Sequence, residues 1–298
     1  MRIDTFDLEF QGTRHVIAAF LVHGPKGPVL VETGPGTTLP TLVARLERQG
    51  LRPADVRDVL VTHIHLDHAG AAGWWARQGA RVHVHPAGAP HLIDPAKLLA
   101  SATRIYGDLM EKYWGEVLPA PADRIVVVED GETFEVGGLE FTAIDTPGHA
   151  RHHHVFQLGD VAFAGDAAGI LPPNNSWIDL LAPPPEFDLV AWKGSLDRLR
   201  GLGLRTLYRT HFDATSDVEA ELARFEELLE KGVDSIQEML DRGLNRQQMI
   251  EEFGAQMRVW AIETGMSEAD ARAYELANPR SMSVDGIARY CRKRRSSS

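Results

Sequence analysis

The chain has 298 residues, 44% hydrophobic and 24% charged, which is typical of a globular protein with a sizeable core. Its net charge of −11 argues against a broad nucleic-acid-binding surface. The single cysteine, Cys291, excludes an intrachain disulfide and a thiolate metal cluster. The N-terminus carries no export signal and no apolar run is long enough to span a bilayer, so we expect a soluble, cytoplasmic protein.

Hydrophobic periodicity and turn residues predict short strands alternating with helices. The expected strands cover 3–10, 15–22, 28–32, 56–61, 80–85, 125–128, 133–136, 139–145, 155–158, 161–164 and 206–208. The expected helices cover 39–49, 69–78, 94–114, 188–200, 217–242, 246–264, 267–276 and 283–294. This pattern predicts two sheets packed face to face with helices outside.

The predicted elements divide into a main α/β domain and a helical extension. Residues 1–215 are expected to form the domain, interrupted by a helical insertion at 95–118. Residues 216–298 are expected to form helices that pack on this core. Tyr106, Tyr113 and Trp114 of the insertion either cover an active site or only pack against one another.

The strongest functional signal follows the apolar run Val59-Leu60-Val61, where the sequence reads Thr62-His63-Ile64-His65-Leu66-Asp67-His68. Imidazole and carboxylate together suit zinc, iron or manganese. In an extended segment His63 and His65 point the same way, whereas the neighbours Asp67 and His68 point oppositely. The spacing therefore predicts two ligand sets and two metal ions.

Three later residues repeat this arrangement, because each comes directly beyond an apolar strand. They are His149 after the turn Thr146-Pro147-Gly148, Asp166 after the strand 161–164, and His211 after the strand 206–208. Strand ends that meet at one edge of a sheet would bring these side chains to the first loop.

With these motifs in order, the chain resembles the metallo-β-lactamase superfamily, in particular its glyoxalase II-like and lactonase-like hydrolases. The resemblance covers about residues 17–211 and implies an αββα sandwich with metals at one edge. It also implies a ligand set for each ion: His63, His65 and His149 for the first metal, Asp67, His68 and His211 for the second, and Asp166 bridging both.

The activity implied by the resemblance is hydrolysis of a small ester, thioester or lactone by a metal-activated bridging water. The cofactor would be two divalent ions, with zinc expected and iron or manganese as alternatives. Asp67 would also carry a proton toward the leaving group. Two alternatives remain open: an iron-dependent persulfide dioxygenase-like oxidoreductase, and a phosphodiesterase or nuclease of the same superfamily.

Weaker signals concern residues that would support the ligands or touch substrate. Glu32 stands where many family members have aspartate, and it either supports the ligands or ends a strand at the surface. His153, Asn175 and Tyr208 lie close to the motifs in sequence, with ordinary solvated or packed roles as the alternative. The expected partner is a small molecule, with no nucleic acid and no membrane, and a homodimer is compatible with the sequence.

The last segment of the chain, 278–295, is basic within an acidic protein. Glyoxalase II has a helical C-terminal region whose basic residues hold its thiol carrier, so the resemblance allows an anionic, cofactor-linked substrate. The simpler interpretation is a basic last turn that complements a helix dipole.

Overall fold

The computed structural model describes residues 2–173, 175–268, 271 and 278–297. Its contacts divide the chain into two compact units. The first contains Met1–Asp145 and His152–Gly165, and the second contains Thr146–Arg151 and Asp166–Ser298.

The first unit contains a six-stranded sheet in the order β1-β2-β3-β4-β5-β6. Its strands are β1 (Arg2–Asp7), β2 (Ala18–Gly24), β3 (Gly27–Val31), β4 (Asp58–Leu60), β5 (Arg81–Val84) and β6 (Ile125–Val127). The first three strands pair antiparallel and β3 to β6 pair parallel. Val29, Leu30 and Val31 of β3 are all fully buried, which is the continuous apolar pattern of a strand covered on both faces.

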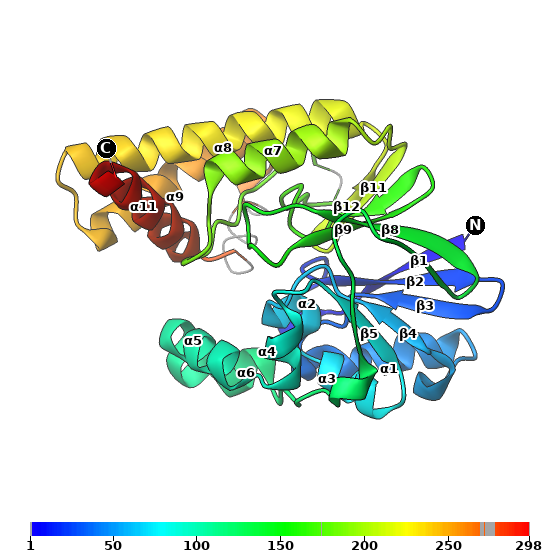
Figure 1. Ribbon diagram of the computed structural model, residues 1–298. Coiled ribbons are helices and arrows are strands. Elements are labelled where there is room, and N and C mark those ends of the chain that lie inside the picture. Colours follow the sequence, from blue (N-terminus) through cyan, green and yellow to red (C-terminus); the bar gives the residue numbers. More distant parts are fainter. Residues whose placement is uncertain (1, 174, 269–270, 272–277, 298) are drawn as a thin grey trace. The chain divides into compact units, whose positions relative to one another are not determined.

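Helices and 3-10 turns connect these strands. The α-helices are α1 (Leu39–Arg48), α2 (Leu66–Ala69), α3 (Ala72–Arg77), α4 (Ala89–Ile93), α5 (Ala96–Tyr106) and α6 (Met110–Trp114). The 3-10 turns are η1 (Phe10–Gly12), η2 (Gly36–Thr38), η3 (Pro53–Asp55), η4 (Gly107–Leu109) and η5 (Ala122–Arg124). Figure 1 shows α1 and α3 on the outer face of the sheet, and α1 buries Leu42 and Leu46 there.

The remaining strands of the first unit are β7 (Thr133–Val136), β8 (Leu139–Asp145), β9 (His154–Leu158) and β10 (Val161–Phe163). Each pairs antiparallel with the next. They face the first sheet through ring contacts: the centroids of the buried rings of Phe20 and Phe163 lie 5.4 Å apart, and those of buried His83 and partly buried Phe134 lie 5.2 Å apart. The core of this unit therefore lies between two sheets, as the sequence predicts.

The second unit contains α7 (Leu189–Arg200), β11 (Thr206–Arg209), β12 (Phe212–Thr215), α8 (Val218–Asp241), α9 (Arg246–Glu263) and α11 (Arg280–Ser297). Asp188 caps α7 by accepting from Ala191 N, and Asn245 caps α9 by accepting from Gln248 N. Helices α7 and α8 run side by side, and α11 packs on α8 and α9 (Figure 1).

Two expected elements differ in the structure. The single helix expected at 69–78 is divided into α2 and α3, and α2 begins earlier, at Leu66. The strand expected at 15–22 begins only at Ala18, because His15 has a left-handed φ of 62° that ends extended pairing.

Two further expectations have other outcomes. Strand β12 was not expected from the sequence, whereas the helix expected at 267–276 lies largely outside the described residues. The helices from residue 218 onward belong to the second unit, and the boundary expected at 215 stays a prediction.

Candidate metal centre

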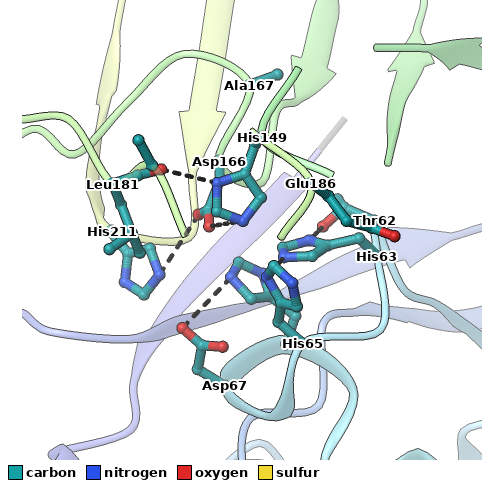
Figure 2. Close-up of polar contacts among 12 residues, drawn as sticks. Thr62, His63, His65, Asp67, His149, Asp166, Ala167, Leu181, Glu186 and His211 are labelled. Carbon is teal, nitrogen blue, oxygen red and sulfur yellow. Dashed lines mark hydrogen bonds and ion pairs between the residues drawn. The ribbon is translucent and has the colours of Figure 1, made fainter. Parts of the chain in front are cut away.

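The first unit gathers four of the expected ligands at the end of β4. His63 and His68 are fully buried, and His65 and Asp67 are partly buried. His63 Nε2 lies 2.9 Å from His65 Nδ1, and His68 Nε2 lies 3.7 Å from Asp67 Oδ2. Figure 2 shows the Asp67 carboxylate directed toward the group of imidazoles that includes His63 and His65. We name these four residues the first ligand set.

The geometry of this set differs from the extended segment that the spacing predicts. His65 is the residue before α2, and Asp67 and His68 lie within that helix, so the expectation of an extended run through His68 was wrong. Successive helical residues are rotated by about 100°, which separates Asp67 from His68 by helical geometry. The two side chains still meet, with His68 Nε2 3.7 Å from Asp67 Oδ2.

A buried carboxylate, Glu32, orients two ligands of this set. Glu32 Oε1 lies 3.1 Å from His68 Nδ1 and accepts a hydrogen bond from the Thr62 hydroxyl. Since a carboxylate only accepts, His68 Nδ1 must donate, and its Nε2 carries the lone pair. Thr62 donates its only hydroxyl proton to Glu32, so its oxygen accepts from His63 Nδ1, 3.1 Å away. One carboxylate therefore leaves Nε2 of both histidines available to a metal.

Glu32 also holds an uncommon backbone conformation. Its side chain is fully buried, and its φ is 66°, in the left-handed region that residues other than glycine rarely adopt. Glu32 N donates to Leu60 O, and Thr62 N lies 3.4 Å from Glu32 Oε2, so β4 and the metal loop fix this turn from both sides. The interpretation of Glu32 as a surface residue was wrong.

The second unit brings together the other three expected ligands around Asp166, which is 2% exposed. His149 Nε2 lies 3.1 Å from Asp166 Oδ2, and His211 Nε2 lies 3.4 Å from Asp166 Oδ1 (Figure 2). His149 Nδ1 donates to the carbonyl of Leu181 at 2.9 Å, which leaves the Nε2 lone pair directed at Asp166. We name these three residues the second ligand set.

Helix α7 fixes two loops of the second ligand set through Trp192. The indole Nε1 donates to Ala167 O, next to Asp166, at 2.8 Å. The same side chain packs on Gly148, where a Cβ would lie 2.3 Å from the Trp192 Cβ, so only glycine fits beside His149. One buried indole thus positions a ligand loop on each side.

The chemistry of these donors fits divalent metal ions. Three imidazoles present a lone pair, because hydrogen bonds to Glu32, Thr62 and Leu181 hold the proton on the other nitrogen. Buried carboxylates are costly unless they are paired or bind a cation, and each oxygen of Asp166 faces an imidazole nitrogen. Imidazole with carboxylate is the ligand combination of zinc, iron and manganese sites.

The weaker predicted residues lie in three different settings. His153 is fully buried, with its ring 4.8 Å from that of His63. Asn175 Oδ1 accepts from Trp177 N at 2.8 Å, a local turn contact. Tyr208 is partly buried on β11, three residues before His211. A role in binding substrate stays a prediction for all three.

Residues outside the predicted set also surround the first ligand set. Tyr106 of the insertion packs on Leu66, the residue before Asp67, and burial together with the charge of Asp67 raises the pKa of Tyr106. It also packs beside Trp114, and its ring centroid lies 5.0 Å from that of Trp114. The sequence offered only the apolar character of the insertion as a signal, because the proximity to Asp67 arises from tertiary packing.

A second group of imidazoles lies in the first unit at His85 and His154. His85 Nε2 is 3.3 Å and His154 Nε2 is 2.6 Å from Asp145 Oδ1. Because His85 Nδ1 accepts from Ala87 N, its Nε2 bears the proton and faces the Asp145 carboxylate, so the three side chains form one polar cluster that we name the Asp145 triad. His154 N also donates to Thr62 O, so the triad supports the metal loop.

A family model of the metallo-beta-lactamase superfamily matches residues 12–211. The chain therefore belongs to the metallo-β-lactamase superfamily, and the αββα fold expected from the motifs is confirmed. A solved structure, the metallo-beta-lactamase family protein TTHA1429 from Thermus thermophilus, is 25% identical with a TM-score of 0.69. That similarity covers 99% of this chain and 94% of TTHA1429.

Two curated relatives are similar over parts of the chain. The metallo-beta-lactamase fold-containing protein ST1585 of Sulfurisphaera tokodaii is 33% identical over 144 residues, which are 47% of this chain and 54% of ST1585. An atrochrysone carboxyl ACP thioesterase of Aspergillus fumigatus is 30% identical over 158 residues, 52% of this chain and 38% of the thioesterase. The chain thus spans about half or less of these relatives' lengths.

Among its described residues, no helix combines the length and hydropathy required to cross a membrane.

Proposed function

We propose that the protein is a binuclear metal-dependent hydrolase that cleaves a small ester, thioester or lactone. The observation that carries the proposal is the preset tautomers of His63, His68 and His149, each of which directs a lone pair toward a neighbouring ligand. Such orientation is typical of metal-binding histidines. Membership of a superfamily that contains metal-dependent hydrolases supports the same conclusion.

The family motif assigns the ligands of each ion. His63, His65 and His149 would hold one metal, Asp67, His68 and His211 the other, and Asp166 both. Two divalent ions, zinc by preference with iron or manganese as alternatives, would supply an activated water and stabilise the oxyanion of the substrate. This assignment comes from the order of the motifs in the family. It requires residues of the first and second ligand sets to bind the same ions.

The chain's own residues would supply orientation and proton transfer. Asp67 is partly buried, so one carboxylate oxygen can bind the metal while the side chain stays accessible to exchange a proton with the leaving group of the substrate. Tyr106 carries a hydroxyl that is protonated near neutral pH, and it can donate a hydrogen bond near Asp67. Glu32 would hold the imidazole of His68 directly and that of His63 through Thr62.

The similarity to a thioesterase favours an acyl substrate over a phosphodiester. The acidic net charge of −11 is unfavourable for a nuclease, so we propose a small-molecule substrate without nucleic-acid or membrane partners. A cytoplasmic location and a homodimer complete the proposal. The persulfide dioxygenase alternative differs in a measurable way, because it requires a single iron and consumes oxygen.

The test combines metal analysis with a hydrolysis screen. The protein is purified without added metal, its metal content is measured, and lactones, acyl thioesters and phosphodiesters are offered as substrates. We expect two divalent ions per chain and turnover of an acyl substrate. One iron with oxygen uptake on a persulfide would replace the proposal with the dioxygenase, and selective cleavage of phosphodiesters would replace it with the phosphodiesterase.

A variant pair separates Asp67 from general effects on the fold. Asp67→Ala should reduce turnover by at least about 10³-fold while the far-UV circular dichroism stays unchanged. Asp123→Ala, which removes an exposed carboxylate in η5, serves as the control and should keep full turnover. Unchanged turnover in Asp67→Ala would refute the assigned role of this residue.

A further inference from the structure

A pocket of about 740 Å³ lies wholly within the second unit, apart from the second ligand set. Its size suits an organic ligand, since such pockets commonly measure about 300–1,000 Å³. It is formed by the segment after the proline run, by the residue Arg151, and by one face of α11. The lining residues are Arg151, Pro185, Glu186, Phe187, Asp188, Arg289, Tyr290, Lys293 and Arg294.

The charges around this pocket are predominantly positive. Four cationic side chains face two carboxylates, and both carboxylates have structural duties. Glu186 pairs with Arg151 at 2.9 Å, and Asp188 caps α7. In the part of the chain that the structure describes, no carboxylate pairs with Arg289. The lining therefore holds two more cationic than acidic side chains, and Arg289 is a cation of this lining to which no described carboxylate is paired.

The spacing of α11 places these cations together. Arg289 and Lys293 are four residues apart, as are Tyr290 and Arg294, so each pair occupies neighbouring turns on adjacent rows of the helix surface. The interaction of basic residues with the helix dipole is confined to the last turn of a helix. Arg289 lies well before the last turn of α11, so the dipole does not explain its place in this cluster.

The pocket also has an aromatic wall. The rings of Phe187 and Tyr290 meet edge to face with centroids 5.3 Å apart, and the Arg294 guanidinium lies 5.6 Å from the Tyr290 ring centroid. Tyr290 is 7% exposed, and burial raises the pKa of its hydroxyl. The site thus offers apolar ring edges beside guanidinium donors, which suits an organic anion rather than a bare ion.

The pocket is tied by hydrogen bonds to the loop of a metal ligand. Arg151 is two residues after His149, and its backbone N donates to Glu186. Asp188 N donates to the carbonyl of Gly148, the residue before His149, at 2.9 Å. The pocket wall and the His149 loop therefore form one hydrogen-bonded structure.

We propose that this pocket binds the phosphate group of a phosphorylated organic ligand. Guanidinium groups bind phosphate with paired, charge-assisted hydrogen bonds, and a phosphate dianion matches the surplus of positive charge. The organic part lies on Phe187 and Tyr290. In the hydrolase, binding of this phosphate would anchor a substrate whose acyl group lies toward His149. The anchoring role rests on the proposed function, whereas phosphate binding does not.

The test measures binding of phenylphosphonate, which combines an aromatic ring with a phosphate-like dianion and has no hydrolysable ester. Titration calorimetry is performed on the full chain as purified and again after dialysis against a chelator. Benzamide serves as the neutral ring, and inorganic phosphate as the anion without a ring. Because no expected metal ligand lines the pocket, binding there should survive chelation, whatever the outcome of the hydrolysis screen.

Variants on α11 locate the binding site. Arg289→Ala and Lys293→Ala should each weaken phenylphosphonate binding by about tenfold, the effect of one lost charge-assisted hydrogen bond. Arg292→Ala is the matched control, since Arg292 is an exposed cation of the same helix that does not line the pocket, and its affinity should change less than twofold.

Each other outcome overturns the proposal in a specific way. Binding that disappears on chelation would place the anion at the metals. Equal losses in the three variants would indicate only a general field of positive charge, and equal affinity for benzamide would indicate a purely apolar site. Inorganic phosphate that binds as tightly as phenylphosphonate would remove the organic part of the ligand from the proposal.

Discussion

Glu32 Oε1 lies 3.1 Å from Nδ1 of His68, and the same oxygen accepts the hydroxyl of Thr62. A single carboxylate therefore determines which nitrogen of two metal-ligand histidines is protonated. Substitution of a residue that orients metal ligands in this way commonly lowers metal affinity by about 10–100-fold.

Glu32→Gln should lower metal affinity by about 10–100-fold, because the amide no longer enforces a proton on His68 Nδ1 and on His63 Nδ1. The fold should persist, since glutamine has the same length and fits the same backbone turn. Competition with a chromophoric chelator measures the affinity. Glu140→Gln on β8, which alters an exposed carboxylate, is the control, and equal affinities in both variants would show that Glu32 has no orienting role.

Gly165→Ala should destabilise the protein by about 3 kcal/mol and weaken metal binding. Gly165 has a φ of 49°, and a Cβ there would lie 2.5 Å from Thr62 Oγ1 and 2.7 Å from His153 Nε2. Thr62 would have to move away from Glu32. Denaturant titration and metal analysis measure the two effects.

Gly159→Ala provides the matched control for this substitution. Gly159 in the β9–β10 turn has a φ of 61° but no atom within 4 Å of an added Cβ. An alanine there would have the unfavourable backbone conformation without a steric clash. That conformation costs about 1–2 kcal/mol. If both variants lose the same stability and Gly165→Ala keeps its metals, the contact with Thr62 does not constrain the site.

Asp58→Asn should cost about 2 kcal/mol near pH 7, with the difference from the wild type vanishing in acid. Burial alone would raise the pKa of Asp58, but hydrogen bonds from His83 and Arg81 outweigh it and lower this pKa. A lowered carboxyl pKa stabilises the folded state above the unfolded value of about 3.9, and this contribution is lost as the pH falls toward the folded pKa.

Chemical denaturation of both proteins from pH 7 to about pH 3 measures this dependence. Asp123→Asn, an exposed carboxylate, should track the wild type throughout. A stability difference for Asp58→Asn that stays constant across this range would contradict the assigned ionisation.

Arg280→Ala should cost about 3–5 kcal/mol, because it leaves Asp179 charged and buried. Arg280 Nη1 lies 2.8 Å from both Asp179 oxygens, and Asp179 is 1% exposed. Replacing both partners, as in Arg280→Met with Asp179→Leu, should recover much of the loss. Thermal and denaturant unfolding measure these differences.

The exposed pair of Arg246 and Asp285 is the internal comparison. It has two hydrogen bonds of 2.7 Å between α9 and α11, yet its arginine side chain is 59% exposed. Arg246→Ala should cost less than about 1 kcal/mol. Equal losses at the two sites would mean that burial does not set the strength of the Arg280 pair.

The sequence by itself determined the class of fold and the candidate ligands. Candidate ligands can be predicted where a histidine or aspartate follows an apolar strand, because the residues after a strand lie at the edge of the sheet. His63, Asp166 and His211 could be selected in this way from residue type and order. The family match over residues 12–211 has confirmed the fold, and the ligand roles stay predictions.

Only the tertiary structure decided how the ligands are oriented. Glu32 and Thr62 are 30 residues apart, and their hydrogen bond depends on the pairing of β3 with β4. The proximity of Tyr106 to Asp67 and the pocket between Arg151 and α11 likewise depend on packing between distant segments. Local periodicity carries no information on such contacts, because they are selected by side-chain shape and burial across the whole fold.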